Sequence, residues 1–329
     1  MIGSDAFAFV YVERVDALAD VLRAVRADGA VIRQNIASPP WSWLNDEPAP
    51  LTLYAVLRGE VWVVPDGGEA APLRAGDTAI VRGPRPHGIA DSPDTPPQVR
   101  IHHARHCTST SDGATLAEED SPRLGPRTYG SLAEAPVALV TGAYRLAGDI
   151  GQRLLDALPP LIVVPASAGG PSSAVALLAE ELDVDQPGQQ LVLDRLLDLL
   201  LVRTLRAWFA SPGAEPPAWY RALADPVVGA ALRAMHGDPG HAWTVASLAA
   251  AADVSRAAFA RRFAELVGEP PLSYLTSWRM ALAADLLREP GATVASVARK
   301  VGYQNDFAFS TAFKRVRGAS PSQVRARER

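Results

Sequence analysis

A pair of arginines in an amphipathic stretch is the first feature of the sequence that could do chemistry. Residues 259–271 read FARRFAELVGEPP. Phe259 and Phe263 are one helical turn apart, so a helix here would pack both rings in a core and turn Arg261 and Arg262 elsewhere. A guanidinium donates paired hydrogen bonds to anions and to the edge of guanine, whereas a charged helix face often contacts only water. The pattern leaves both interpretations open.

A second group of reactive side chains lies in IHHARHCTST, residues 101–110. His103, His106 and Cys107 are metal-ligand types at close spacing, and the thiol could instead react with oxidants. The same residues are also consistent with the polar end of a strand that passes into a loop. Metal binding, thiol sensing and a plain strand end are three interpretations, and we expect no bound metal or other cofactor.

The arginine-bearing stretch has a second copy, because Phe-x3-Phe-x4-Gly-x2-Pro recurs 50 residues later in FSTAFKRVRGASP. The similarity covers 244–271 and 293–321, which both begin with Thr-Val-Ala-Ser. Each copy predicts a short helix, a tight turn and a longer helix, which is the helix-turn-helix pattern. Gly268 and Gly318 would end the longer helices, and Gly302 can adopt a positive φ in the second turn.

One long helix is predicted between the two copies, over PLSYLTSWRMALAADLLREP at 271–290. At roughly 1.5 Å per residue it would be about 25–30 Å long. That length approaches the roughly 34 Å that separates successive turns of a DNA groove. A single chain could therefore present two helices to one face of a duplex.

Composition and charge bound the class of protein. With 48% hydrophobic and 21% charged residues, the 329-residue chain is typical of a globular protein. It shows no membrane-length apolar run and no pattern of a secretory signal, and its single cysteine fits a reducing cytosol. We expect a cytoplasmic protein that does not contact a membrane.

The net charge of −4 conceals an asymmetry. From Asp225 onwards, 14 basic and 9 acidic residues give a net charge of +5. Residues 1–224 hold 18 basic and 27 acidic residues, a net charge of −9. A basic C-terminal third on an acidic body favours a polyanionic partner for that third alone.

The chain divides into regions of different pattern. Residues 1–145 are predicted to be largely β, with a helix over 16–29, a loop over 108–135 and short strands that favour a sandwich or barrel. Residues 146–212 are predicted to be helical. Residues 213–220 form a Pro-rich linker, and residues 221–329 are predicted to be all helical, with helix-turn-helix units at 244–268 and 293–318.

The middle region is predicted to be a hairpin of two helices, 172–183 and 189–210. The second helix is apolar over more than half of its circumference, so it must bury much of that surface. Packing against its own domain and a subunit interface are the two alternatives.

The last hundred or so residues resemble the DNA-binding domain of the AraC/XylS family of bacterial transcription regulators. The most specific match is VARKVGYQNDFAFSTAFKRVRGASPSQVR, with Ala-x3-Gly-Tyr, Phe-Ser-x-Ala-Phe-Lys-Arg and Gly-x-Ser-Pro in order. Residues 1–160 resemble more weakly the cupin-type effector domain of one branch, through LRGEVWVVPDGG and PLRAGDTAIVRGPRPHGIAD. The resemblance implies an α+β multidomain protein: a cupin-like β-barrel (jelly roll), a middle helical hairpin and an all-α double helix-turn-helix.

The resemblance also implies which side chains meet DNA. In the first unit the matching positions are Ser255 (as N-cap), Arg256, Ala257, Ala260 and Arg261, with Arg262 directed to phosphate. In the second unit they are Asn305, Asp306, Phe307, Ser310 and Thr311, with Lys314, Arg315 and Arg317 as phosphate contacts. Arg279 and Arg299 are further candidates for phosphate. Family members often place a basic residue where Thr311 stands, and Asp306 is repelled by phosphates, so we expect the first unit to supply most of the sequence recognition.

The cupin-like region lacks the first part of the metal motif of that fold, His-x-His-x3-4-Glu. Only His87 lies near the position of the later histidine, and one histidine cannot hold a catalytic metal. We therefore do not expect an enzyme. The candidates for lining a ligand pocket, each with core packing as the alternative, are Trp41, Trp43, Tyr54, Trp62 and His87.

Together these patterns predict a transcription regulator that binds double-stranded promoter DNA and whose N-terminal domain senses a small molecule or another signal. If the protein is an activator, RNA polymerase is an expected partner. A homodimer is a further candidate assembly. Two alternatives stay open. One is a cupin metal-binding protein or enzyme with an appended DNA-binding module, and the other is an architectural DNA-binding protein without an effector.

Overall fold

The computed structural model describes residues 30–103, 106–116, 123–125, 127–130, 132–144, 148–168 and 172–326. The helix predicted over 16–29 lies outside these residues. The described chain divides into two compact units, with the boundary between Pro217 and Ala218. Each unit is described by itself.

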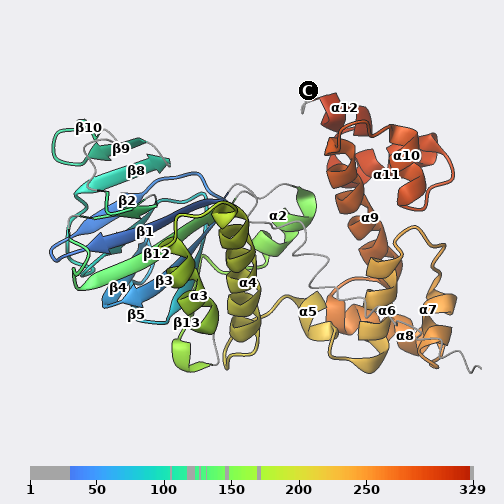
Figure 1. The fold of residues 1–329 in the computed structure, drawn as a ribbon. Coiled ribbons are helices and arrows are strands. Elements are labelled where there is room, and N and C mark those ends of the chain that lie inside the picture. The colour runs from blue at the N-terminus through green and yellow to red at the C-terminus, as the bar shows by residue number, and fades with distance from the viewer. Residues whose placement is uncertain are drawn as a thin grey trace, which may run out of the picture. The chain divides into compact units, whose positions relative to one another are not determined.

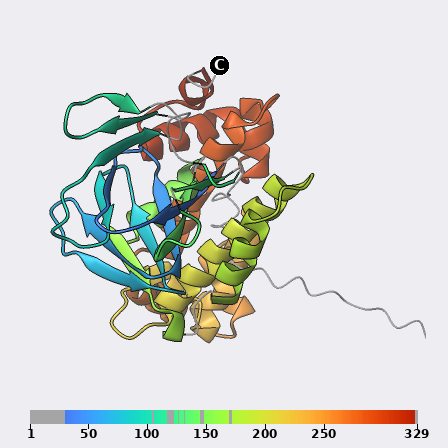
Figure 2. The same ribbon diagram turned by 60° about the vertical axis from the view of Figure 1, so that its left-hand side comes forward.

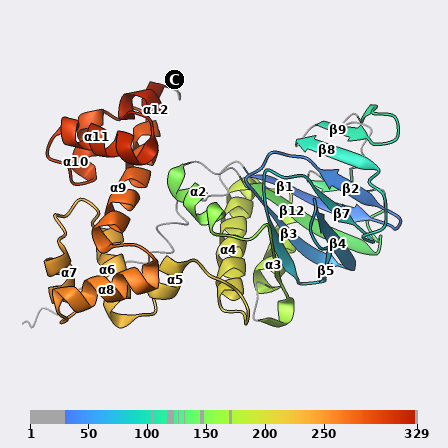
Figure 3. The same cartoon turned by 180° about the vertical axis from the view of Figure 1, so that it is seen from behind.

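The N-terminal unit is built from two sheets (Figures 1 and 3). The first has the order β11-β1-β12-β3-β6-β13 and the second the order β10-β9-β8-β2-β7-β4-β5. The strands of the first sheet are β1 (Val31–Ala37), β3 (Leu51–Arg58), β6 (Thr78–Arg82), β11 (Thr128–Tyr129), β12 (Val137–Tyr144) and β13 (Leu161–Val164). Those of the second are β2 (Ser42–Asn45), β4 (Glu60–Pro65), β5 (Ala71–Arg74), β7 (His87–Ala90), β8 (Val99–His103), β9 (His106–Ser109) and β10 (Thr115–Leu116).

A hydrophobic core fills the space between the sheets. It includes Val56, Val61 and Leu139, which have no exposed surface. Strand β3 is buried along most of its length, and the helix at Ser172–Leu182 packs against it. The expected cupin-like architecture is thus present, with one gap in the prediction: two-residue strands β10 and β11 lie within the segment expected to be a loop.

The helical hairpin of the middle region consists of α3 (Ser172–Leu182) and α4 (Gln189–Phe209), as the apolar periodicity predicts. Figures 1 and 2 show both helices beside the sheets. Gly142 of β12 leaves room for Leu197, since a Cβ at Gly142 would lie 2.9 Å from the Leu197 Cδ2 atom. Tyr144 Oη also donates to the Leu197 carbonyl at 2.7 Å. One face of α4 therefore packs against the sheet of its own unit.

Strand β13 corrects the expectation that residues 146–212 are wholly helical. The segment between α2 (Asp149–Asp156) and α3 contains LIVV, which pairs antiparallel with β6 at the edge of the first sheet. Four consecutive apolar residues fit a buried strand as well as a helical turn, and only the pairing partner decides between them. None of the helices in the described part of the chain combines the length and apolar character that a bilayer span requires.

The C-terminal unit is all helical. Its helices are α5 (Ala218–Ala222), α6 (Pro226–Gly237), α7 (Val245–Ala251), α8 (Arg256–Val267), α9 (Pro271–Arg288), α10 (Val294–Lys300), α11 (Asp306–Arg317) and α12 (Pro321–Ala326). The two predicted helix-turn-helix units are α7–α8 and α10–α11. Both begin with the same capping box, in which the Thr244–Ser247 and Thr293–Ser296 pairs satisfy backbone amides reciprocally.

Helix α9 joins two separate hydrophobic cores (Figure 1). Tyr274 and Leu275 in its first half pack with Phe259 and Phe263 of α8. Met280, Ala284 and Leu287 in its second half pack with Phe309 and Phe313 of α11. The phenylalanine pairs are fully buried, as predicted. The single helix α9 packs against both helix-turn-helix units.

Candidate nucleic-acid interface

The two longer helices start and end in the same way. Ser255 Oγ accepts from the Ala258 amide at 3.3 Å, and Asn305 Oδ1 accepts from the Ala308 amide at 2.7 Å. Both are therefore N-caps, and each satisfies one backbone amide. The remaining first-turn amides, at the positive end of each helix, can bind an anion. Gly268 and Gly318 adopt left-handed conformations at the C-caps, as predicted.

On α8, the side chains not used for packing form an exposed cationic face. Arg256, Ala257 and Arg261 are exposed, and Ala260 is half-buried. The Nε atom of Arg261 lies 3.8 Å from Glu265 Oε1, with side-chain exposures of 74% and 65%. An exposed pair at this distance contributes little, so the guanidinium can exchange the carboxylate for another acceptor at small cost. The two alanines leave space for close approach of a groove.

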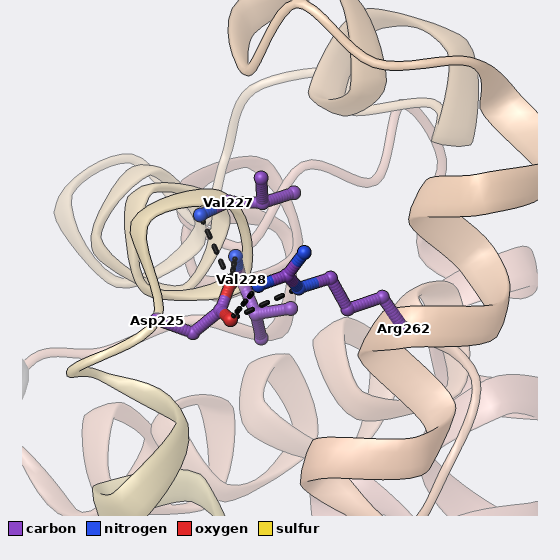
Figure 4. Close-up of polar contacts among 4 residues, drawn as sticks. All are labelled: Asp225, Val227, Val228 and Arg262. Atoms are coloured by element: carbon purple, nitrogen blue, oxygen red, sulfur yellow. Dashed lines mark hydrogen bonds and ion pairs between the residues drawn. The ribbon is translucent and has the colours of Figure 1, made fainter.

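Arg262 is held by a different partner. Its Nε and Nη2 atoms donate to Asp225 Oδ2 at 2.9 and 2.6 Å, and Asp225 Oδ1 accepts from the amides of Val227 and Val228 (Figure 4). Asp225 thus caps α6 and joins it to α8 at the same time. Burial acts to raise the pKa of Asp225, but hydrogen bonds from the Val228 amide and from Arg262 bring it below its ordinary value. This long-range contact is not visible in the local sequence.

On α11 the exposed face is less cationic near the N-terminus. Asp306 and Thr311 are exposed and Ser310 is half-buried. Phe307 is 84% exposed, which is unusual for so large an apolar side chain. Lys314 and Arg315 are exposed in the last turn, and neither forms an ion pair with a described residue.

Arg279 has an internal role that the sequence did not suggest. From α9, its Nε donates to the Pro239 carbonyl at 2.6 Å and its Nη2 to the His241 carbonyl at 2.7 Å. A Cβ added to Gly302, which has φ +84°, would lie 2.6 Å from the Gly240 carbonyl oxygen. The loop before α7 therefore packs between α9 and the turn of the second helix-turn-helix unit. Arg299, by contrast, is exposed on α10.

The candidate ligand residues of the N-terminal unit separate into three environments. Trp43 and Tyr54 line a cleft between the two sheets. Trp41 is buried in the core, and half-buried Trp62 on β4 is not among the cleft residues. His87 lies behind the cleft, buried against Tyr54. The further side chains that line the cleft are Val31, Arg33, Asn35, Asn45, Glu47, Ile89, Ile101, Thr141 and Ala143.

A buried chain of hydrogen bonds supports this cleft. Asn45 Nδ2 donates to Tyr54 Oη at 2.9 Å, and Tyr54 Oη lies 2.7 Å from His87 Nε2. Because Tyr54 accepts from Asn45, its own proton is available to Nε2, which leaves Nδ1–H facing the Arg85 carbonyl at 3.4 Å. Burial lowers the pKa of His87 to about 4, so the ring is neutral at pH 7.

The His/Cys segment forms the hairpin of β8 and β9. His103 pairs with His106 across the hairpin, and the two rings stack at 5.5 Å. Cys107 pairs with Ile101, and because it follows His106 on a strand it points to the opposite face. Within the residues that the structure describes, no three His, Cys, Asp or Glu side chains are grouped closely enough to hold a metal ion.

The signal that would have located the cleft lies in VIRQNIA, the sequence of β1. Side chains two apart on a strand share a face, so Val31, Arg33 and Asn35 all reach the cleft. The period-2 alternation in this strand is therefore the sequence signal that points to Arg33.

A double helix-turn-helix unit with exposed cationic helices, joined to a two-sheet cupin-like unit, defines a DNA-binding transcription regulator. Residues 16–210 match the family model described as Cupin, and residues 248–327 match the Helix-turn-helix domain model. The chain is 35% identical over 320 residues to an AraC-like transcription regulator of Streptomyces antibioticus, covering 94% of this chain and 98% of that one. The chain belongs to the AraC family of transcription regulators and carries an N-terminal cupin domain.

Other similar proteins carry related names. The HTH-type transcriptional regulator AlkR of Acinetobacter baylyi is 38% identical over 280 residues, which cover 84% of this chain and 87% of that one. Among solved structures, the DNA-binding domain of AdpA in complex with a target DNA is 34% identical, covers 32% of this chain and 93% of that chain, and has a TM-score of 0.30. The family resemblance and the fold class inferred from the sequence are confirmed.

Proposed function

We propose that this regulator binds promoter DNA with α8 and α11 in the major groove on one face of the duplex, and that α8 supplies most of the base recognition. The observation that carries the proposal is the contrast between the two helices. The exposed side chains of α8 include Arg256 and Arg261, whereas the first turns of α11 present Asp306, Phe307 and Thr311.

Base recognition by α8 follows from the chemistry of its arginines. A guanidinium donates two hydrogen bonds to guanine O6 and N7, and each such pair discriminates by about 1–3 kcal/mol. Arg256 forms no ion pair with a described residue, and Arg261 has only the weak contact with Glu265. In this proposal Arg262 is a positioning residue, because its guanidinium is already bound to Asp225.

The second helix-turn-helix unit, α10–α11, contributes affinity through contacts with DNA phosphates. Lys314 and Arg315 in the last turn of α11, together with Arg299 and Arg317, supply sequence-independent attraction. Phe307 can contact a thymine methyl group, the apolar feature of the major groove.

A footprint of the full-length protein on the region upstream of its own gene tests the DNA proposal. We expect two protected segments about one helical turn apart on one face, with strong base dependence in the segment that α8 occupies. Protection of one segment only, or equal affinity for any duplex, would contradict the paired arrangement.

We further propose that the N-terminal unit senses a small molecule in the cleft between its sheets, and that occupancy shifts the population of DNA-binding-competent arrangements. Support comes from the cleft lining, which combines apolar side chains with a few polar and charged ones, among them Asn45, Tyr54 and Glu47. The partner for transcription would be RNA polymerase, and the site of action the bacterial cytoplasm. The protein is then a regulator without catalytic activity.

Metal analysis of the purified protein tests the alternative, a cupin metalloprotein. Stoichiometric bound metal would support that alternative.

A homodimer through α4 is the assembly that we propose. While one face of α4 packs on the sheet, its opposite face exposes Val192 (43%) and Leu199 (41%), with Leu191 (60%) to one side. Val192 and Leu199 are seven residues apart, the spacing of a helix-helix seam. Sedimentation of the full chain should show a dimer that Leu199→Glu dissociates. An unchanged sedimentation coefficient in that variant would place any interface elsewhere.

A further inference from the structure

The cleft between the sheets holds one cationic and one anionic side chain, and together they indicate the class of its ligand. Arg33 reaches it from β1, and Glu47 from the segment after β2. The cleft is small and partly enclosed, and residues of both sheets line it. This inference rests on the proposed sensing function of the N-terminal unit.

One hydrogen-bond donor of Arg33 is buried without a partner in the part of the chain that the structure describes. Its Nη2 atom is buried and has no hydrogen-bond partner among the described residues. A buried charged donor left unsatisfied is unfavourable, so native proteins nearly always provide an acceptor. A planar guanidinium is best satisfied by a carboxylate, which can accept two parallel hydrogen bonds.

Glu47 makes a simple organic acid a poor fit for the same cleft. Neither Glu47 nor Arg33 forms an ion pair with a described residue. Both charges act on one thiol: burial raises the pKa of Cys107, Arg33 opposes this effect and Glu47 adds to it. A ligand with only a carboxylate would be repelled by Glu47, and one with only an amine would leave Arg33 unsatisfied.

The walls between the two charges are preorganised. Asn45 Oδ1 accepts from the Glu47 amide at 3.2 Å, while its Nδ2 is bound to Tyr54. On the facing sheet, Asn35 Nδ2 donates to Thr141 Oγ1 at 3.4 Å. The rest of the lining is apolar, with one large aromatic ring: Val31, Trp43, Ile89, Ile101 and Ala143.

We propose that this cleft binds a small amino acid or a closely related amphoteric molecule. The carboxylate pairs with Arg33, the ammonium group pairs with Glu47, and a short apolar side chain packs on Trp43. Each charged group of the ligand then satisfies one charge of the cleft, and neither is left unpaired in a partly buried site.

Isothermal titration calorimetry of the full-length protein tests the proposal with three matched sets of probes. The first set is the twenty standard amino acids, the second the corresponding acids that lack the amino group, and the third the amines that lack the carboxylate. We expect at least one small apolar amino acid to bind, and its des-amino and decarboxylated analogues to bind at least 10-fold more weakly. No binding by any amino acid, or equal binding of an analogue, would overturn it.

Two variants that each remove one charge separate recognition from folding. Arg33→Gln should abolish the preference for the carboxylate, and Glu47→Gln the preference for the ammonium group, each with at least a 10-fold loss of amino-acid affinity. Thr95→Ala, which removes a half-buried loop hydrogen bond to Asp91 in the same unit, is the control and should bind normally. Thermal unfolding of each variant verifies its fold. If both Gln variants fold and bind the amino acid like wild type, the assignment of the cleft is wrong.

A second readout distinguishes this inference from the proposed function. The affinity of the same preparations for the footprinted DNA is measured with and without the bound amino acid. Binding that leaves DNA affinity unchanged contradicts the sensing function but keeps the ligand class. A change in DNA affinity caused by an unrelated molecule, with no amino acid bound, contradicts the ligand class but keeps the sensing function.

Discussion

Arg262 donates two hydrogen bonds to Oδ2 of Asp225, whereas its neighbour Arg261 extends from the same helix towards solvent. Two adjacent arginines with the same sequence context therefore have different roles. The difference arises because Arg262 projects towards the N-terminus of α6, where Asp225 already caps the helix through its other carboxylate oxygen.

Asp225→Asn should keep the cap and lose the ion pair, because asparagine is also a good N-cap residue. Asp225→Ala should lose both and lower the free energy of unfolding by about 1–2 kcal/mol. Hydrogen exchange of the full-length protein at the amides of Val227 and Val228 measures the difference, with faster exchange only in the alanine variant. Arg262→Ala is the matched control and should resemble Asp225→Asn. If all three variants exchange alike, the carboxylate does not cap α6.

Arg261→Ala should weaken binding to the cognate site by about 1–3 kcal/mol and relax the preference at one base position. Gel-shift titrations on the cognate duplex and on single-base variants measure both effects. Lys314→Ala is the control for a phosphate contact and should weaken binding to all sequences alike, with a shallower salt dependence. An equal loss on random DNA for Arg261→Ala would make that residue a phosphate contact.

Phe307→Ala should leave stability within about 0.5 kcal/mol of wild type, because the ring is 84% exposed and contributes nothing to the core. Affinity for the cognate site should fall by roughly 1 kcal/mol if the ring buries apolar area against a thymine methyl. Replacing that thymine with uracil should reproduce the loss in the wild type and have no further effect on the variant. An additional loss from uracil in the variant would show that the ring does not contact the methyl.

Gly302→Ala should destabilise the C-terminal unit beyond the backbone cost of a left-handed residue, which is about 1–2 kcal/mol. The added Cβ would also lie 2.6 Å from the Gly240 carbonyl oxygen. Gly268→Ala is a matched control, because it has a similar φ of +91° but no atom within 4 Å of the added Cβ. Urea unfolding of the full chain compares the two. Equal destabilisation would mean that the contact with the loop before α7 does not constrain the turn.

His87 should make the N-terminal unit less stable as the pH falls below neutrality. Its folded-state pKa is lowered to about 4 from an ordinary value of 6.5, because burial disfavours the charged ring. The unfolded chain therefore binds a proton before the folded chain does, so stability is full above pH 6.5 and declines as the pH falls towards 4. Urea unfolding at pH 7 and at pH 5 measures the loss. His87→Gln should show a smaller difference between the two pH values, and an unchanged difference would assign the effect to other groups.

Local signals predicted the C-terminal unit well. The caps at Ser255 and Asn305, the glycines that end α8 and α11, and the buried phenylalanine pairs all depend on residues within a few turns of one another. Strand β13 and the charged cleft were missed, because a strand is defined by its partner and a cleft by side chains that several strands bring together. The separation of Arg33 and Glu47 along the chain gives no sign that they line one space.

The sequence by itself determined the class of this protein, since duplicated helix-turn-helix units are specified by capping residues, turn glycines and apolar spacing within each short repeat. Tertiary structure decided which charges remain available for a partner. Arg262 pairs with a residue 37 positions away and Arg279 binds the carbonyls of a loop before α7, while Arg261 and Arg315 stay exposed. The physical reason is that Arg262 and Arg279 bind acceptors at least 37 positions away in the chain, which only folding brings within hydrogen-bonding distance.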